Sequence, residues 1–373
     1  MTKPKISRDT YLSRNLGDYA PTMQVGGIEY EKIEDLRYGT NPHQTAAFYR
    51  PTGHAGALAG MEMLKTGKNG LSQTNLEDIS YALNIVKFFD RPACACMKHV
   101  NPSGAAVATA TGEPLVEVYG KARDCDPRAA FGSVVGFNTR VDEPTAKEIM
   151  GSFVECVVAP DFDPRAMAVF NHPENKLNRH IRIIRCGDLR TLPKFIGDDI
   201  EGCRTIKVLH DGSLVVAAPL LTAVRSADDL PPARASSKSL GEQVSTVEAN
   251  EQQLQDLVTA WYINLSVRSN GVVLVRNGGT LAVGTGEQDR VGAVEQALIK
   301  FREKYQGAET AAGSAMASDG FFPFPDGVEV AAAGGVRAIV APAGSLRDAA
   351  VIERANQLGV ALRHAPERIF SHH

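Results

Sequence analysis

Apolar positions along this chain follow two periods in turn, which predicts alternating strands and helices. Short runs of β-branched and small apolar residues indicate buried strands, whereas apolar residues at every third or fourth position indicate helices. Asp211-Gly212 and Asn277-Gly278-Gly279 each separate two strand-like runs and predict hairpins. The predicted strands are 93–97, 133–137, 153–159, 181–185, 206–210, 214–217, 271–275, 281–283 and 336–342, and the predicted helices are 76–90 (capped by Asn75), 251–263, 291–305 and 348–358.

The alternation of strands and helices in both halves predicts an α/β fold, with mixed sheets because hairpins are present. The sequence becomes polar between 221 and 250, which indicates a connection between the halves. We therefore expect a first subdomain over 1–220, a connector with a helix over 221–265, and a second subdomain over 266–373. No sequence repeat between the halves is evident.

Composition narrows the class of protein. The 373 residues include 43% hydrophobic side chains and carry a formal net charge of −3. No basic tract or aromatic-basic stripe favours nucleic acid, and no apolar run is long enough to span a bilayer. The start has no apolar stretch after its basic residues, so no secretory signal is predicted. Six cysteines in so long a chain do not indicate a disulfide framework. These features predict a soluble cytoplasmic protein the size of an enzyme.

The most informative segment is 94–106, which reads CACMKHVNPSGAA. A buried strand ends there in Lys98 and His99, and Asn101, Pro102 and Gly104 predict a turn after them. Open α/β folds bind ligands at strand ends, and an ammonium beside an imidazole suits general-base chemistry next to a developing oxyanion. The alternative is a pair of solvated basic residues at an exposed strand end.

Other motifs carry candidate binding groups. Segment 36–44 (LRYGTNPHQ) offers the Arg37 fork for a phosphate or carboxylate and the Tyr38 ring, or is an ordinary polar loop. In segment 126–138 (DPRAAFGSVVGFN), a glycine would let a ligand approach the backbone closely. The alternative is a tight connection between a loop and the following strand. The aromatic rings of segment 318–327 (SDGFFPFPDG) could bind a planar heterocycle between them. The alternative is that they pack into the hydrophobic core.

A zinc site is not predicted. Cys94, Cys96 and His99 have ligand-like spacing, but alternation places both thiols on one face of a buried strand, and no fourth ligand is evident. The zinc-deaminase signature is also absent.

These motifs occur in the order and approximate spacing of one family. The chain resembles the phosphoribosylaminoimidazolecarboxamide (AICAR) formyltransferase part of the bifunctional purine-synthesis protein that also carries IMP cyclohydrolase. The likeness runs from about residue 30 to the C-terminus and is weakest over 161–250. Only some 35 residues precede the LRYG motif. The resemblance therefore implies a monofunctional formyltransferase, with ring closure left to a separate IMP cyclohydrolase.

The resemblance also implies two fused cytidine-deaminase-like α/β/α subdomains without a zinc site, and a homodimer with active sites at the subunit interface. The substrates would be AICAR and 10-formyltetrahydrofolate, and the products formyl-AICAR (FAICAR) and tetrahydrofolate. Neither nucleic acid nor a membrane is an expected partner. Whether the protein binds a monovalent cation is left open.

Site residues follow from the motif matches. His99 resembles the general base that deprotonates the 5-amino group. Lys98 resembles the group that stabilises the formyl oxygen or protonates the leaving folate nitrogen, and Asn270 aligns close to the reacting groups. Positions that match AICAR contacts are Arg37, Tyr38, Asn75, Phe131, Gly132, Glu155, Phe321, Arg368 and His372. Of these, Arg368 is the cation expected to bind the nucleotide phosphate, and Glu155 is the acid expected to bind the ribose hydroxyls. Positions that match the folate pocket are Phe324, Asp326, Gly344 and Ser345.

Departures from the family pattern keep two alternatives open. Ser103 replaces a common cysteine, Gly320 replaces an alanine, and Pro325 replaces an arginine of some members. One alternative is a non-catalytic AICAR- or folate-binding paralogue. The other is a formyltransferase with a different donor or aminoimidazole. Retention of Lys98, His99 and Asn270 favours the enzyme.

Overall fold

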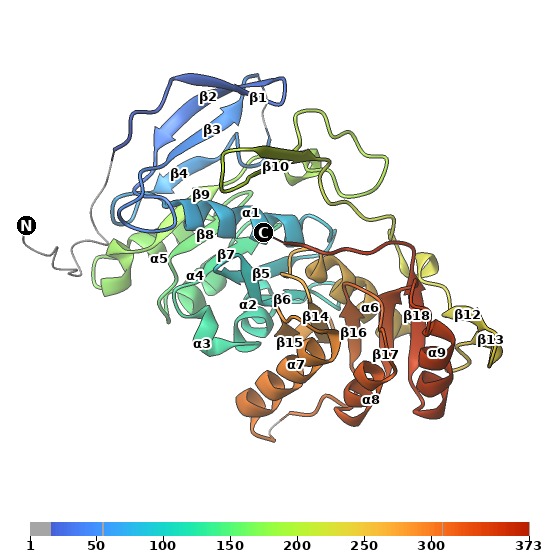
Figure 1. Ribbon diagram of the computed structural model, residues 1–373. Coiled ribbons are helices and arrows are strands. Elements are labelled where there is room, and N and C mark those ends of the chain that lie inside the picture. The colour runs from blue at the N-terminus through green and yellow to red at the C-terminus, as the bar shows by residue number, and fades with distance from the viewer. Residues whose placement is uncertain (1–15, 54–55, 308, 373) are drawn as a thin grey trace, which may run out of the picture.

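A mixed sheet runs through both halves of the chain in the computed structural model, which describes residues 16–53, 56–307 and 309–372 (Figure 1). Among these residues it has eleven strands in the order β18-β17-β16-β14-β15-β6-β5-β7-β8-β9-β4. The strands are β4 (Glu62–Lys65), β5 (Ala93–Lys98), β6 (Asn101–Val107), β7 (Val134–Phe137), β8 (Cys156–Ala159), β9 (Arg182–Arg185), β14 (Val272–Arg276), β15 (Gly279–Gly284), β16 (Ala315–Ser318), β17 (Ala338–Pro342) and β18 (Ala361–Ala365).

Helices cover both faces of this sheet. One face packs against α1 and α6, and the other packs against α2, α4 and α5 in the first half and α7, α8 and α9 in the second. Strand residues alternate between the two faces and are buried on both, which explains their nearly continuous apolar runs. The helices are α1 (Gln73–Val86), α2 (Leu115–Asp124), α3 (Pro127–Ala130), α4 (Glu143–Ile149), α5 (Pro164–Asn171), α6 (Glu251–Asn264), α7 (Arg290–Tyr305), α8 (Asp326–Ala333) and α9 (Asp348–Gln357).

Smaller elements lie around this core. β1 (Thr22–Val25), β2 (Ile28–Asp35) and β3 (Ala47–Pro51) form an antiparallel sheet at the N-terminal end. β10 (Thr205–Val208) pairs with β11 (Leu214–Ala217), and β12 (Arg234–Ser237) pairs with β13 (Gly241–Val244). In the part of the chain described, no helix is both long and apolar enough to cross a bilayer.

The two halves repeat one topology. In each, an antiparallel hairpin (β5–β6 or β14–β15) is followed by strands that are parallel to one another (β7–β8–β9 or β16–β17–β18). The first strand of each hairpin pairs antiparallel with the first of those parallel strands. The repeat escapes sequence inspection because the pattern of elements is kept while the residues differ.

The halves meet where β6 pairs with β15. Gly279 lies opposite Ala106, and the Val107 N–H donates to the Gly278 carbonyl at 2.9 Å. The hydroxyl of Thr280 accepts from the Ala105 N–H at 2.9 Å and donates to the Ala105 carbonyl at 3.1 Å. A side chain thus supplies part of the backbone pairing at this junction.

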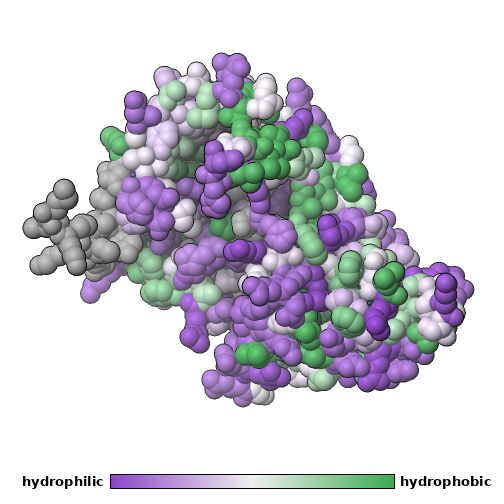
Figure 2. All heavy atoms as spheres, viewed as in Figure 1, coloured by the Kyte–Doolittle hydropathy of each residue, from purple (hydrophilic) through white to green (hydrophobic). Residues whose placement is uncertain are grey.

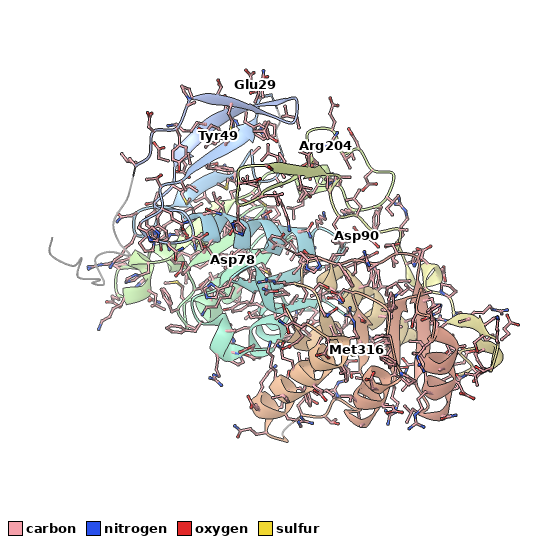
Figure 3. The ribbon with its side chains drawn as sticks, viewed as in Figure 1. Glu29, Tyr49, Asp78, Asp90, Arg204 and Met316 are labelled. Carbon is pink, nitrogen blue, oxygen red and sulfur yellow. The ribbon has the colours of Figure 1, made fainter. Side chains whose placement is uncertain are left out.

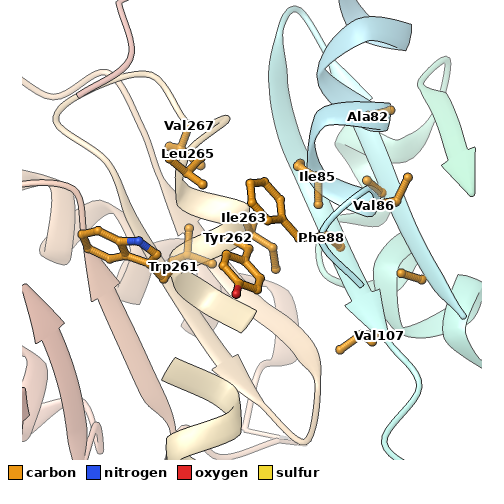
Figure 4. Close-up of a cluster of buried hydrophobic side chains, with 14 of the residues drawn as sticks. Ala82, Ile85, Val86, Phe88, Val107, Trp261, Tyr262, Ile263, Leu265 and Val267 are labelled. Carbon is orange, nitrogen blue, oxygen red and sulfur yellow. The ribbon is translucent and has the colours of Figure 1, made fainter. Parts of the chain in front are cut away.

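A shared hydrophobic cluster supports the junction (Figure 4). It joins Ile85, Val86 and Phe88 of the first half to Trp261 and Tyr262 of α6. The rings of Phe88 and Tyr262 stack with centroids 4.4 Å apart. Burial of these aromatic side chains on both sides of the junction stabilises one continuous structure.

Most sequence expectations hold. The α/β class with a mixed sheet is confirmed, and both predicted hairpins form. Several elements were not foreseen: helices α2 to α5 and α8, and strands β1 to β4, β12, β13, β16 and β18. The cap of α1 is Ser72 rather than Asn75, which is instead the third helical residue and bonds back to the Ser72 N–H.

The predicted turn at Asn101, Pro102 and Gly104 is wrong. β6 begins at Asn101, and the turn consists of His99 and Val100, because Lys98 pairs directly with Asn101. Pro102 fits within the strand because the register shifts between Cys96 and Met97, and an irregular position tolerates a missing N–H.

Replacing Thr280 with valine should destabilise the junction. The change keeps the side-chain shape but leaves the backbone groups of Ala105 without their partner, which costs about 1–3 kcal/mol of unfolding free energy. Urea denaturation measures the loss. Thr246→Val, at an exposed threonine, is the matched control and should change stability by no more than about 0.5 kcal/mol. Equal effects of both variants would contradict the role of Thr280.

Candidate active site

The β5–β6 hairpin presents Lys98 and His99 at its tip. His99 and Val100 both have left-handed backbones, with φ of 56° and 63°. The Lys98 ammonium donates to the Phe131 carbonyl at 2.5 Å. Lys98 therefore ends β5 and His99 begins the turn that follows it, so the two residues are neighbours at the hairpin tip.

Phe131 and Gly132 form the neighbouring wall. They follow α3, whose N-terminus is capped by the Asp126 side chain. The Phe131 ring is 60% exposed and lies 5.2 Å from the ring of Phe153, centroid to centroid. Gly132 has φ of 77°, and a Cβ there would come within 3.4 Å of Phe153. The wall thus combines exposed aromatic surface with an accessible backbone.

A polar wall lies across from these rings. The Asn75 amide donates to Glu155 Oε2 at 2.9 Å, and Arg182 Nη1 lies 4.0 Å from the same oxygen. Arg37 is buried beside it, donates to the Tyr38 hydroxyl at 3.0 Å, and has its guanidinium 4.6 Å from the Tyr38 ring centroid. Burial and the neighbouring Arg182 lower the pKa of Arg37. Two buried guanidiniums thus lie behind the wall that carries Tyr38 and Glu155, and neither of them lines the cavity itself.

These walls enclose a cavity of about 600 Å³, a size suited to a small organic ligand. Several residues that the sequence singled out line it together. They are Tyr38, Asn75, Lys98, His99, Phe131, Gly132 and Glu155, and the other lining residues are Thr40, Ser72, Thr74, Glu77, Asp78, Val100 and Phe153.

A second group surrounds Asn270 in the other half. The side-chain oxygen of Asn270 accepts from Arg290 at 2.6 Å, and Arg290 forms a buried ion pair with Asp319. The guanidiniums of Arg290 and Arg368 lie 5.8 and 4.4 Å from the ring centroid of Phe370. None of these residues lines the 600 Å³ cavity. His372 lines a different cavity, of about 660 Å³, next to the β10–β11 hairpin.

A third group gathers where β16 and β17 end. Gly344 has φ of 134°, and a Cβ there would lie 3.6 Å from the Phe321 ring. Phe324 is half exposed beneath the Arg347 guanidinium, 5.1 Å from its ring centroid. Asp326 opens α8, and the Ser345 N–H donates to Asp348 at 3.1 Å. The predicted folate positions thus lie near one another but away from Lys98 and His99.

Sequence inspection missed several residues of these groups: Asp78, Phe153, Arg182, Arg290 and Asp319. Asp78 had a usable signal, because it lies three positions after Asn75 on the same face of a predicted helix. Arg182 had none, because its contacts with the loop at Lys68 and Gly70 span more than a hundred residues of chain.

Comparisons with known proteins agree with these motifs. A family model described as AICARFT/IMPCHase bienzyme matches residues 6–300. The chain belongs to this family.

Its similar proteins include several named "Bifunctional purine biosynthesis protein PurH". The one from Desulfitobacterium hafniense is 37% identical over 361 residues, which cover 97% of this chain and 62% of the relative. Those from Oceanobacillus iheyensis and Bacillus cereus are 34% and 35% identical and cover 92% and 97% of this chain, and 60% and 63% of the relatives. The chain thus spans less than two thirds of the length of these relatives.

Within this family member, Asp78 is the most perturbed acid of the cavity. Its side chain is only 5% exposed, and Asp78 Oδ1 accepts from the Val100 N–H at 2.6 Å. Burial is the main cause that raises the pKa of Asp78 to about 7; the nearby acids Glu155 and Glu77 act in the same direction, and the N–H groups of Val100 and His99 act against them. Among the described residues, no group of His, Cys, Asp and Glu could hold a metal ion.

The raised pKa predicts a pH-dependent stability. The folded state keeps the Asp78 proton up to about pH 7, whereas an unfolded aspartate releases it near pH 4. Ionisation therefore costs the folded state free energy, and wild-type stability should fall relative to Asp78→Asn by roughly 2–4 kcal/mol between about pH 4 and pH 7. Urea unfolding across this range measures the difference. Asp18→Asn, at an exposed acid, should show no such trend, and a pH-independent difference for Asp78→Asn would contradict the assignment.

Proposed function

We propose that this protein transfers the formyl group of 10-formyltetrahydrofolate to the 5-amino group of AICAR, giving FAICAR and tetrahydrofolate in purine biosynthesis. The observation that carries the proposal is the Lys98–His99 tip, which opens into a cavity of about 600 Å³ in a chain of the AICARFT/IMPCHase family. The names of the similar proteins place them in purine biosynthesis.

In this proposal His99 is the general base. Its imidazole takes a proton from the amine as the amine nitrogen bonds to the formyl carbon, because a delocalised aromatic amine is too weak a nucleophile while it keeps that proton. The bond between the formyl carbon and the folate nitrogen then breaks, and that nitrogen keeps the electron pair and accepts a proton. Lys98, held by the Phe131 carbonyl, stabilises the negative oxygen or supplies this proton.

The cavity walls suit the parts of AICAR. The planar imidazole would lie against Phe131 and Gly132, where the ring pair with Phe153 offers an aromatic surface. Glu155, oriented by Asn75, would accept hydrogen bonds from the ribose hydroxyls. Arg37, which is buried beside the lining residue Tyr38, would add positive charge for a phosphate bound near Tyr38.

The remaining predicted residues would come from a second copy of the chain. Asn270, Phe321, Arg368 and His372 lie outside the cavity of their own chain, so a homodimer with active sites at its interface would complete the site. The same arrangement would bring the folate positions Phe324, Asp326, Gly344 and Ser345 to a neighbouring Lys98.

The β10–β11 hairpin supports this dimer. Its apolar side chains are unusually exposed: Val208, Leu214 and Val216 are 69%, 54% and 48% accessible. Figure 2 shows hydrophobic residues gathered over this part of the surface. A two-stranded hairpin alone is marginally stable, and exposed aliphatic patches of this kind mark interaction sites. We propose that a second copy covers it.

We also propose a single activity, a division into subdomains and a possible cation site for this protein. Formyl transfer is the only activity proposed, with ring closure of the product by a separate IMP cyclohydrolase in the cytoplasm. The subdomain division at 1–220, 221–265 and 266–373, and its cytidine-deaminase-like character, stay predictions. So does a monovalent cation, for which Asn264 offers a buried side-chain oxygen without a partner among the described residues.

Turnover of AICAR with 10-formyltetrahydrofolate tests the reaction, with added cyclohydrolase to remove product. Lys98→Ala and His99→Ala should each lower kcat by about 10²–10⁴-fold, while AICAR binding by calorimetry changes little. Lys147→Ala and His172→Ala, at exposed positions, are the controls. Saturable AICAR binding without wild-type turnover would favour the binding paralogue or another formyl donor, and full activity of His99→Ala would remove the proposed base.

Charges on the hairpin test the dimer. The double change Val208→Asp/Leu214→Asp, at a directly paired position, should raise the dimer dissociation constant at least about tenfold, because each charge would lose water at the interface. Turnover should fall with the dimer population in sedimentation and activity assays. Ile299→Asp is the control, since Ile299 is similarly exposed (45%) on α7. A fully active monomeric wild type, or an unchanged dimer in the double variant, would contradict the assignment.

A further inference from the structure

The turn that carries His99 has an unfavourable backbone. Both of its residues are left-handed, and neither is glycine or asparagine. Two-residue hairpin turns of this kind strongly prefer Asn-Gly, and a β-branched valine is especially disfavoured with positive φ. Such a conformation persists only where the surrounding structure enforces it, and it commonly does so at functional sites.

One side chain enforces this turn. Asp78 projects from α1, and its carboxylate accepts from the Val100 N–H at 2.6 Å. The backbone N–H of His99 also interacts with this carboxyl group and lowers its pKa. Figure 3 marks Asp78 in the interior of the first half. Asp78 thus faces consecutive amides of the left-handed pair and hydrogen-bonds the second of them.

The second half contains the same device with different turn residues. Asp256 on α6 accepts from the N–H groups of Asn277 and Gly278, each at 2.8 Å. Asp78 and Asp256 are each the sixth residue after a helix cap, Ser72 and Asn250. Each turn begins 21 residues after its aspartate.

The two turns differ in how well their residues suit a left-handed backbone. Asn277 and Gly278 are also left-handed, with φ of 51° and 71°, and they are the residues that such a turn prefers. His99 and Val100 take their places in the first half. The first turn therefore depends on its aspartate for a conformation that the second turn favours by its own residues.

We propose that Asp78 is a positioning residue, which holds the His99–Val100 turn so that the imidazole stays aimed into the cavity. The inference rests on the proposed function for its catalytic consequence. Asp78 acts through the backbone of the turn and takes no proton from the substrate. The same face of α1 carries Asn75, which orients Glu155, so this one helix face supports two walls of the cavity.

Three variants test the inference in the full-length protein. Asp78→Ala should lower kcat about 10²-fold, since small misplacements of a catalytic group cost that much, with AICAR affinity changed less than about threefold. Asp78→Asn keeps an acceptor oxygen and should recover at least about tenfold of that loss. Asp78→Ala/Val100→Gly gives the turn the glycine of its counterpart and should also recover at least about tenfold over Asp78→Ala.

Asp256→Ala is the matched control. It removes the equivalent buried carboxylate from the other turn, so it should destabilise the protein in urea comparably to Asp78→Ala and change kcat no more than about twofold. The inference is overturned if Asp256→Ala lowers kcat as much as Asp78→Ala. It is equally overturned if Asp78→Ala keeps wild-type kcat, or if neither the Asp78→Asn change nor the added Val100→Gly change restores activity.

Amide hydrogen exchange separates this inference from the proposed reaction. The His99 and Val100 amides should be protected in the wild type and exchange at least about tenfold faster in Asp78→Ala. Protection lost without any wild-type turnover would reject the reaction and support Asp78 as the residue that holds the turn. Unchanged protection would overturn the role of Asp78 whatever the activity.

Discussion

The pairing of β6 with β15 is the contact on which the rest of the structure depends. It joins two halves of the same topology into one sheet, and Thr280 completes the hydrogen bonding where the strands meet. Because β6 also belongs to the hairpin that carries Lys98 and His99, the junction fixes the cavity relative to the second half. Asn101 adds to this, since its side-chain oxygen accepts from the Arg268 N–H and from Thr285.

Repetition of the topology makes the differences between the halves informative. Each half places a helix aspartate under a hairpin turn, but only the first half puts an imidazole and a valine in that turn. The second half has residues that suit the turn, and no chemistry is proposed there. In the first half the energetic cost of the turn is offset by Asp78, whose own burial raises its pKa to about 7.

Electrostatics give the cavity two distinct ends. Buried Arg37 and Arg182 provide positive charge around Glu155, while Lys98 lies at the hairpin tip with its ammonium on a backbone carbonyl. The second and third groups of predicted residues lie outside this cavity, which is why the proposed reaction needs a second copy of the chain.

The sequence by itself determined the α/β class, the type of the strongly periodic elements and the motifs that identify the family, because these depend on local periodicity and short contiguous segments. It also placed Lys98 and His99 at a strand end. Only the tertiary structure decided that His99 and Val100 form the turn, that Asp78 holds them, and that Phe131, Asn75 and Glu155 share their cavity. Those facts depend on hydrogen bonds and packing between segments 20 to 80 residues apart in the chain, and no local pattern encodes such pairings.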